Sequence, residues 1–167
     1  MEAVDVGLLL LRLGLAALVA GHALQKSLGW FRGAGFAATA QVFESWGFRP
    51  GRRMVAVAAV SELTAAVLVG TGLAFPLGCA IAVGTMVVAA APSAAQGLWA
   101  HLGGCEVPVL YGFVAACLAV TGPGALSLDQ ALGVPDGGAA GTVAALVLAL
   151  LAPVVPLAQR RRALRTA

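Results

Sequence analysis

A chain of 167 residues in which 60% are hydrophobic and only 10% are charged does not have the composition of a soluble domain, where about a quarter of the residues carry a charge. The mean hydropathy of +0.96 instead favours a bundle of membrane-spanning helices. The formal net charge is +3, but no soluble element is available to present a basic face. We therefore expect no binding of nucleic acid.

Five apolar stretches lie close to the roughly 20 residues that a spanning helix needs. They are 6–25, 54–75, 76–95, 105–121 and 139–157. The first stretch carries its cations inside the apolar run, whereas a cleavable signal peptide carries them in front of a shorter run. We therefore expect the first helix to be retained, and the fold to be all-α, a transmembrane helical bundle with the lipid bilayer as its surroundings.

The segment of about 28–50, between the first two stretches, is rich in aromatic residues. Phe36, Ala40 and Phe43 recur at helical spacing, with polar residues beside them. This pattern predicts a short amphipathic helix that lies in the membrane interface. A disordered glycine-rich loop and a lid over a pocket between the helices are the two alternatives.

The distribution of arginines predicts the orientation of the chain. Arg49, Arg52 and Arg53 lie in the first loop, and four more arginines lie within 160–165. The segment 122–138 contains neither lysine nor arginine. Because cytoplasmic loops carry the excess of positive charge, we expect a multi-pass protein of the bacterial plasma membrane. Its N-terminus would lie outside, and its basic tail would lie in the cytoplasm.

A few ionisable residues fall inside or at the ends of the apolar stretches, where an unpaired charge costs several kcal/mol. At about 100° per residue, Arg12, His22 and Lys26 share one face of the first helix. Glu62 belongs to the second stretch, and Glu106 begins the fourth. A rise of about 1.5 Å per residue places Glu62 within reach of Arg12, and Glu106 level with Lys26.

Two interpretations of these charges remain open. In one, the pairs Arg12–Glu62 and Lys26–Glu106 only hold the helices in register. In the other, the same residues line a polar cavity that binds a small ligand or moves protons. We expect no metal site, because His22 and the second histidine lie on different elements without the spacing of metal ligands.

The cysteines do not form a recognised redox motif, since the chain contains no CxxC sequence. Cys79 and Cys117 fall at similar depths near the outer face, so a disulfide between them is geometrically open. The alternative is that both are small apolar residues of the core.

Four short motifs can be compared with known families. They are Leu11-Arg12-Leu13-Gly14 followed by His22 and Lys26, Ser61-Glu62-Leu63, Glu106-Val107-Pro108, and Gly122-Pro123-Gly124 followed by Ser127 and Asp129. Together they resemble the DoxX family of small bacterial membrane proteins, and the last is similar to a GPG-x-x-SLD ending in that family. The resemblance covers about residues 6–133. It implies a four-helix membrane core in 1–133. The fifth span and the basic tail, in 134–167, are an addition beyond that core.

The glycine-containing motif also has a local interpretation. A serine or aspartate that precedes or begins a short helical turn can accept hydrogen bonds from its free N–H groups. We therefore expect Ser127 or Asp129 to cap a turn that ends near Leu132.

Some relatives within the DoxX family are linked to quinone-dependent and oxidative-stress systems. The resemblance implies an accessory subunit of a membrane redox system, with a quinone or small solute in the cavity and a soluble redox enzyme on the cytoplasmic face. Arg12 and Lys26 would supply positive charge, while Glu62, Glu106 and His22 would position the ligand or transfer protons. A non-enzymatic scaffold that recruits a soluble partner to the arginine-rich face is one alternative, and a small transporter that uses Glu62 as a proton-coupled site is another.

Overall fold

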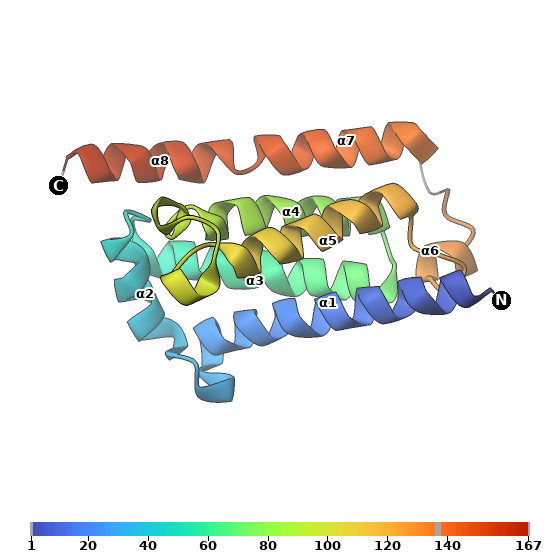
Figure 1. The fold of residues 1–167 in the computed structure, drawn as a ribbon, viewed down its shortest axis with the longest axis horizontal. Helices are drawn as coiled ribbons and strands as arrows, with labels where there is room; N and C mark the ends of the chain where they lie inside the picture. Colours follow the sequence, from blue (N-terminus) through green and yellow to red (C-terminus); the bar gives the residue numbers. More distant parts are fainter. Residues whose placement is uncertain (1, 136–137, 167) are drawn as a thin grey trace.

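A computed structural model describes residues 2–135 and 138–166, and within these residues every regular element is a helix (Figure 1). The long elements are α1 (Ala3–Leu28), α3 (Gly51–Thr71), α4 (Phe75–Ala90), α5 (Glu106–Thr121), α7 (Gly138–Leu151) and α8 (Val154–Arg165). The short ones are η1 (Trp30–Arg32), α2 (Gly35–Ser45), η2 (Ala94–Gln96), η3 (Ala100–Leu102) and α6 (Leu128–Ala131). The expected all-α bundle is confirmed.

Helix α4 occupies the centre of the bundle, because it packs against α3, α5 and α7, while α1 packs on the other side of α3. Small residues permit this close packing. A Cβ atom at Gly78 of α4 would lie 2.7 Å from the Cβ atom of Leu68 on α3. Ala66, Cys79 and Ala82 are buried in the same core. The three-residue turn between α3 and α4 makes them an antiparallel pair, as the short connection in the sequence predicts.

By length and composition, α1, α3 and the stretch Gly138–Arg165 could each cross a membrane, while α4 and α5 are shorter apolar helices. Their outward faces carry many exposed leucine and valine side chains, which suits contact with lipid. The apolar stretch 76–95 is longer than the helix within it, because α4 ends at Ala90, just before Pro92, as a proline at that position predicts. The last stretch divides at Pro153, between α7 and α8, which was not expected.

The segment between α1 and α3 is helical, so the prediction of a short helix is correct and the disordered loop is excluded. Helix α2 runs across one end of the bundle (Figure 1) and packs on α1 and α3. Its contact with α3 is very close, since a Cβ atom at Gly51 would lie 2.2 Å from the carbonyl oxygen of Ala40. Phe43, Trp46 and Phe48 form a cluster of aromatic rings at this end.

The two arginine-rich segments lie at the same end of the molecule. Arg160 Nε of α8 donates to the carbonyl oxygen of Trp46 at 2.9 Å, and its guanidinium lies 5.7 Å from the ring centre of Phe48. We call this the arginine-rich end, and the opposite end, with the N-terminus and α6, the N-terminal end (Figure 1). The two termini therefore lie at opposite ends of the bundle (Figure 1). Which end faces the cytoplasm stays a prediction from the charges.

Candidate functional site

Arg12 is buried at the N-terminal end of the bundle, with a relative exposure of 1%. Its Nε and Nη2 atoms donate to the carbonyl oxygens of Val69 and Gly70, each at 3.0 Å. Its Nη1 atom donates to the carbonyl oxygens of Pro123 and, at 3.1 Å, Leu126. Val69 and Gly70 belong to the last turn of α3, where carbonyl groups lack helical partners and the helix dipole is negative. Backbone groups therefore satisfy this guanidinium, which explains why it can be buried without a carboxylate.

Asp129 is buried beside Arg12 and caps a helix other than its own. Its carboxylate accepts hydrogen bonds from the backbone N–H groups of Ala74 at 2.8 Å and Phe75 at 2.9 Å, at the start of α4. A carboxylate at a helix N-terminus satisfies free donors and complements the dipole. Ser127 accepts from the N–H group three residues later, at 3.2 Å, and so caps α6 as the sequence predicts.

The backbone around these two side chains fits only glycine at one key point. Gly72 has a φ of +69°, and a Cβ atom there would lie 2.6 Å from Ser127 Cβ and 2.8 Å from Arg12 Nη2. Its carbonyl oxygen also accepts from Asp129 N at 3.0 Å. We call Arg12, the carbonyl groups that it binds, Gly72 and Asp129 the Arg12 cluster. The run Gly122, Pro123 and Gly124 contributes to packing between helices, because the carbonyl oxygen of Pro123 binds Arg12 of α1.

The second polar group lies nearer the arginine-rich end, where Lys26 of α1 forms an ion pair with Glu62 Oε1 of α3. The predicted contact between Arg12 and Glu62 is wrong. Arg12 already has four carbonyl acceptors, and the flexible side chain of Lys26 spans the difference in depth. The predicted pairing of Lys26 with Glu106 is also wrong, because Glu106 Oε2 accepts from the backbone N–H of Ala100 at 2.8 Å.

Glu62 is more deeply buried than its partner, with 2% of its side chain exposed against 22% for Lys26. Its second oxygen, Oε2, has no hydrogen-bond partner among the described residues. Buried polar atoms in native proteins are nearly always hydrogen-bonded, so an exception indicates a missing partner.

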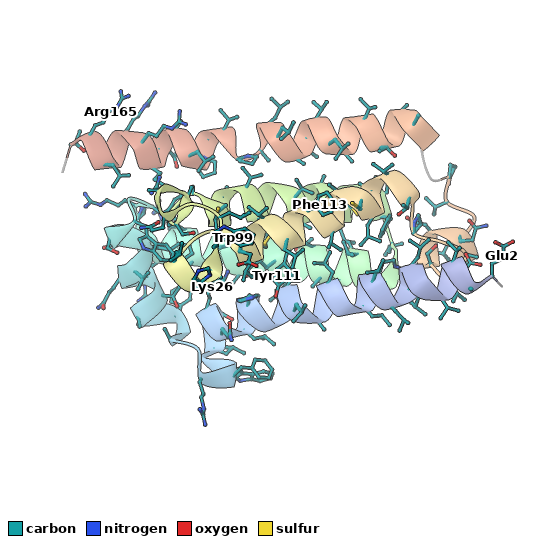
Figure 2. All side chains as sticks on the ribbon, viewed as in Figure 1. Glu2, Lys26, Trp99, Tyr111, Phe113 and Arg165 are labelled. Carbon is teal, nitrogen blue, oxygen red and sulfur yellow. The ribbon has the colours of Figure 1, made fainter. Side chains whose placement is uncertain are left out.

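A cavity of about 820 Å³ lies against this ion pair, within the size range of small-molecule sites. Its polar lining residues are His22, Lys26, Thr39, Ser61, Glu62, Thr85 and Gln159, and its aromatic ones are Phe43, Trp46, Phe48 and Tyr111. Most of the remaining wall is aliphatic and comes from α3, α4, the start of α5 and the junction between α7 and α8. Lys26 and Tyr111 both lie in the half of the bundle nearer the arginine-rich end (Figure 2).

The structure therefore divides the predicted site residues into two groups. His22, Lys26 and Glu62 line one cavity, whereas Arg12 and Glu106 bind backbone groups elsewhere. The rings of His22 and Tyr111 lie next to each other in the cavity wall, tilted and with 5.8 Å between their centroids. The aromatic segment of about 28–50, for which a lid over a pocket was one alternative, supplies part of this wall. Tyr111 was missed, because nothing in its local sequence distinguishes it.

The described residues include no group of three or more histidines, cysteines or acids that could hold a metal ion. The three cysteines are free. Cys79 is buried in the core, as expected of a small apolar residue, and Cys117 is exposed on α5, so the disulfide considered above is not formed.

The DoxX family model matches residues 7–102, which is more than half of the chain and extends from α1 to η3. It includes Arg12, Lys26 and Glu62, and it ends before Glu106 and the run of Gly122 to Asp129. Neither a curated protein nor a solved structure matches the chain.

Proposed function

We propose that this chain, which belongs to the DoxX family of membrane proteins, serves as an accessory subunit of a membrane redox or oxidative-stress system. In this role, its cavity of about 820 Å³ binds a quinone or a similar small amphiphile. The observation that carries the proposal is the presence of a buried Lys26–Glu62 ion pair on the wall of a largely apolar cavity.

A quinone needs an apolar space for its ring and chain, and polar hydrogen atoms for its carbonyl oxygens. The aliphatic and aromatic walls meet the first requirement. Lys26 meets the second, because an ammonium group has three donors and only one of them is directed to Glu62 Oε1. A buried ion pair is costly to maintain and adds little stability compared with apolar residues, which is the reason to assign it a role in binding.

The surroundings of the cavity also suit a ligand that arrives from the bilayer. Val42, Trp46 and Val57 line the cavity and are each more than 40% exposed, so the cavity is open along an apolar part of its wall. We infer that this opening faces lipid, so that an amphiphile could enter without crossing water.

Binding of a quinone can be tested with purified protein in lipid nanodiscs and 2-decyl-1,4-benzoquinone as the probe. Trp46 lines the cavity, so specific binding should quench its fluorescence, and Trp46→Phe should remove this component. Ala58→Phe would place a ring inside the cavity, and we expect it to weaken binding at least about tenfold. Ala56→Phe, on the exposed face of the same helix, is the matched control and should bind normally.

Quenching in wild-type nanodiscs that does not exceed simple partitioning would contradict the proposed cavity function. Equal affinity in the wild type and in Ala58→Phe would contradict it as well. The thermal unfolding midpoint of each variant establishes that the fold has been kept.

A second function, recruitment of a soluble partner, is favoured by the position of the arginines. Arg49, Arg52 and Arg53 are exposed next to α8, which carries the basic tail. We propose that a soluble redox enzyme with an acidic face docks at this cytoplasmic surface. Capture of that enzyme from a cell extract should be lost when the three arginines are changed together to glutamine, and should persist when the exposed Gln96 and Gln130 are changed to alanine.

A further inference from the structure

The unpartnered oxygen of Glu62 limits which ligands suit the cavity. Glu62 lines the cavity, and its Oε1 is bound to Lys26, while its Oε2 is buried and lacks a partner among the described residues. An ionised carboxylate can only accept hydrogen bonds. Leaving such an acceptor unsatisfied costs about 1–3 kcal/mol or more. The occupant of the cavity therefore gains most if it donates a hydrogen bond to Oε2.

The charges around Oε2 select among the possible donors. Lys26 already neutralises Glu62, and the positive charge of an amine would be placed beside the ammonium group of Lys26 in a poorly hydrated site. A carboxylic acid that ionised would face Glu62 and be repelled. A neutral hydroxyl group avoids both penalties, so an alcohol or a phenol is the preferred class of donor.

The walls of the cavity favour a phenol over an aliphatic alcohol. Aromatic side chains from α1, α2 and α5 surround it, including His22, Trp46 and Tyr111. Aromatic rings pack favourably on one another in offset or edge-to-face arrangements. A ring that carries the hydroxyl group uses these walls better than an aliphatic alcohol, and the remaining aliphatic surface accommodates an attached chain.

We propose that the cavity prefers a neutral phenol or hydroquinone with an alkyl chain, whose O–H group donates to Glu62 Oε2, over the corresponding quinone. This inference rests on the proposed function, since it presupposes that the cavity binds an amphiphile. It adds the chemical state of the ligand: a quinone has only acceptors, so it can use Lys26 but leaves Oε2 without a partner.

The test uses three probes that share one decyl chain: 2-decylhydroquinone, its dimethyl ether, and 2-decyl-1,4-benzoquinone. Binding to protein in nanodiscs is measured by equilibrium dialysis without oxygen, and partitioning into protein-free nanodiscs is subtracted. We expect the hydroquinone to bind about tenfold more tightly than either of the other two, which corresponds to one good hydrogen bond.

A conservative variant provides a sharper readout than loss of binding. In Glu62→Gln the ammonium group of Lys26 still requires an acceptor, so the amide oxygen should face Lys26 and the NH₂ group should face the cavity. The preference should then shift towards the benzoquinone, whose carbonyl can accept from that NH₂ group. Glu2→Gln, the same substitution at an exposed glutamate at the N-terminal end and outside the cavity lining, is the matched control and should keep the preference for the hydroquinone.

The outcomes separate the two proposals. If no probe binds above partitioning, the proposed function fails and this inference fails with it. If all three probes bind equally in the wild type, or the benzoquinone binds best, the cavity function stands. The preference for a donor is then overturned, and a water molecule is the better candidate for the partner of Oε2. An unchanged preference in Glu62→Gln would overturn the assignment to Glu62.

Discussion

Two buried charged side chains, Arg12 at the N-terminal end of the bundle and Glu62 nearer the arginine-rich end, differ in their hydrogen bonding. Arg12 is 1% exposed and donates to four backbone carbonyl groups. Glu62 is 2% exposed and leaves one oxygen without a partner, next to a cavity of about 820 Å³. Burial of a charge therefore does not by itself distinguish a structural residue from a binding residue. A partner for every buried polar atom, each of them a backbone group held by the fold, indicates a structural role.

The physical basis of the contrast is the kind of partner at each end. The acceptors of Arg12 are carbonyl groups held in place by the end of α3 and by the turn before α6, so they have no freedom to rearrange around a ligand. The partner of Glu62 is the flexible side chain of Lys26, which is 22% exposed. A flexible partner can move when a ligand binds, and a fixed one cannot. We therefore expect changes in the Arg12 cluster to affect stability and changes around Glu62 to affect binding.

The largest effect is expected for Arg12→Leu. The change leaves carbonyl groups of Val69, Gly70, Pro123 and Leu126 buried without a donor, and removes the link from α1 to α3. Each buried carbonyl group left without a donor costs about 1–3 kcal/mol of the free energy of unfolding. The thermal unfolding midpoint in detergent should fall sharply, whereas Arg12→Lys, which keeps a cation and three donors, should lose less. A midpoint equal to that of the wild type would contradict the structural role.

The next largest effect is expected for Gly72→Ala, because the new Cβ atom would meet both Ser127 and Arg12. Strain from a left-handed backbone and from overpacking should together lower the free energy of unfolding by about 2 kcal/mol or more. Gly133→Ala separates the two causes, since Gly133 has a φ of +65° but no atom within 4 Å of the added Cβ. That control should lose only about 1 kcal/mol. Equal losses in the two variants would show that contact with Arg12 is unimportant.

A smaller loss is expected for Asp129→Ala, which removes the cap at the start of α4. Loss of such a cap typically costs about 1 kcal/mol. The cap lies at the opposite end from the cavity, so the affinity for decylbenzoquinone should stay within about twofold of wild type. A large change in affinity without a change in the unfolding midpoint would contradict the division between the two ends.

The smallest effect on stability is expected when the ion pair is replaced as a whole. Lys26→Met combined with Glu62→Leu removes both charges together, and such replacements are often neutral or stabilising. We expect the unfolding midpoint of the double variant to stay close to wild type while binding of the probes is reduced. Lys26→Met alone is the control, and it should be less stable than the double variant because it leaves Glu62 buried without a partner. If the double variant failed to fold, Glu62 would have a structural role, as Arg12 has.

Features that depend on neighbouring residues were predicted well. The apolar runs indicated the helices, and of the two expected caps, Ser127 and Asp129, the first does cap the turn that follows it. The cap formed by Asp129 was not foreseen, because its partner Ala74 lies 55 positions away in the sequence. The last span was expected as one apolar stretch, and Gly138–Arg165 is long and apolar enough to cross a membrane, but Pro153 divides it into α7 and α8.

The amino-acid sequence by itself determined that this is a helical membrane bundle, and that Arg12, Lys26 and Glu62 are charges which have to find partners inside it. Only the tertiary structure decided which partners they have. Backbone carbonyl groups are the same in every residue, so no sequence pattern marks the four that bind Arg12. The cavity beside Glu62 likewise arises where side chains from distant helices fail to fill the space between them, which no single stretch of the chain can specify.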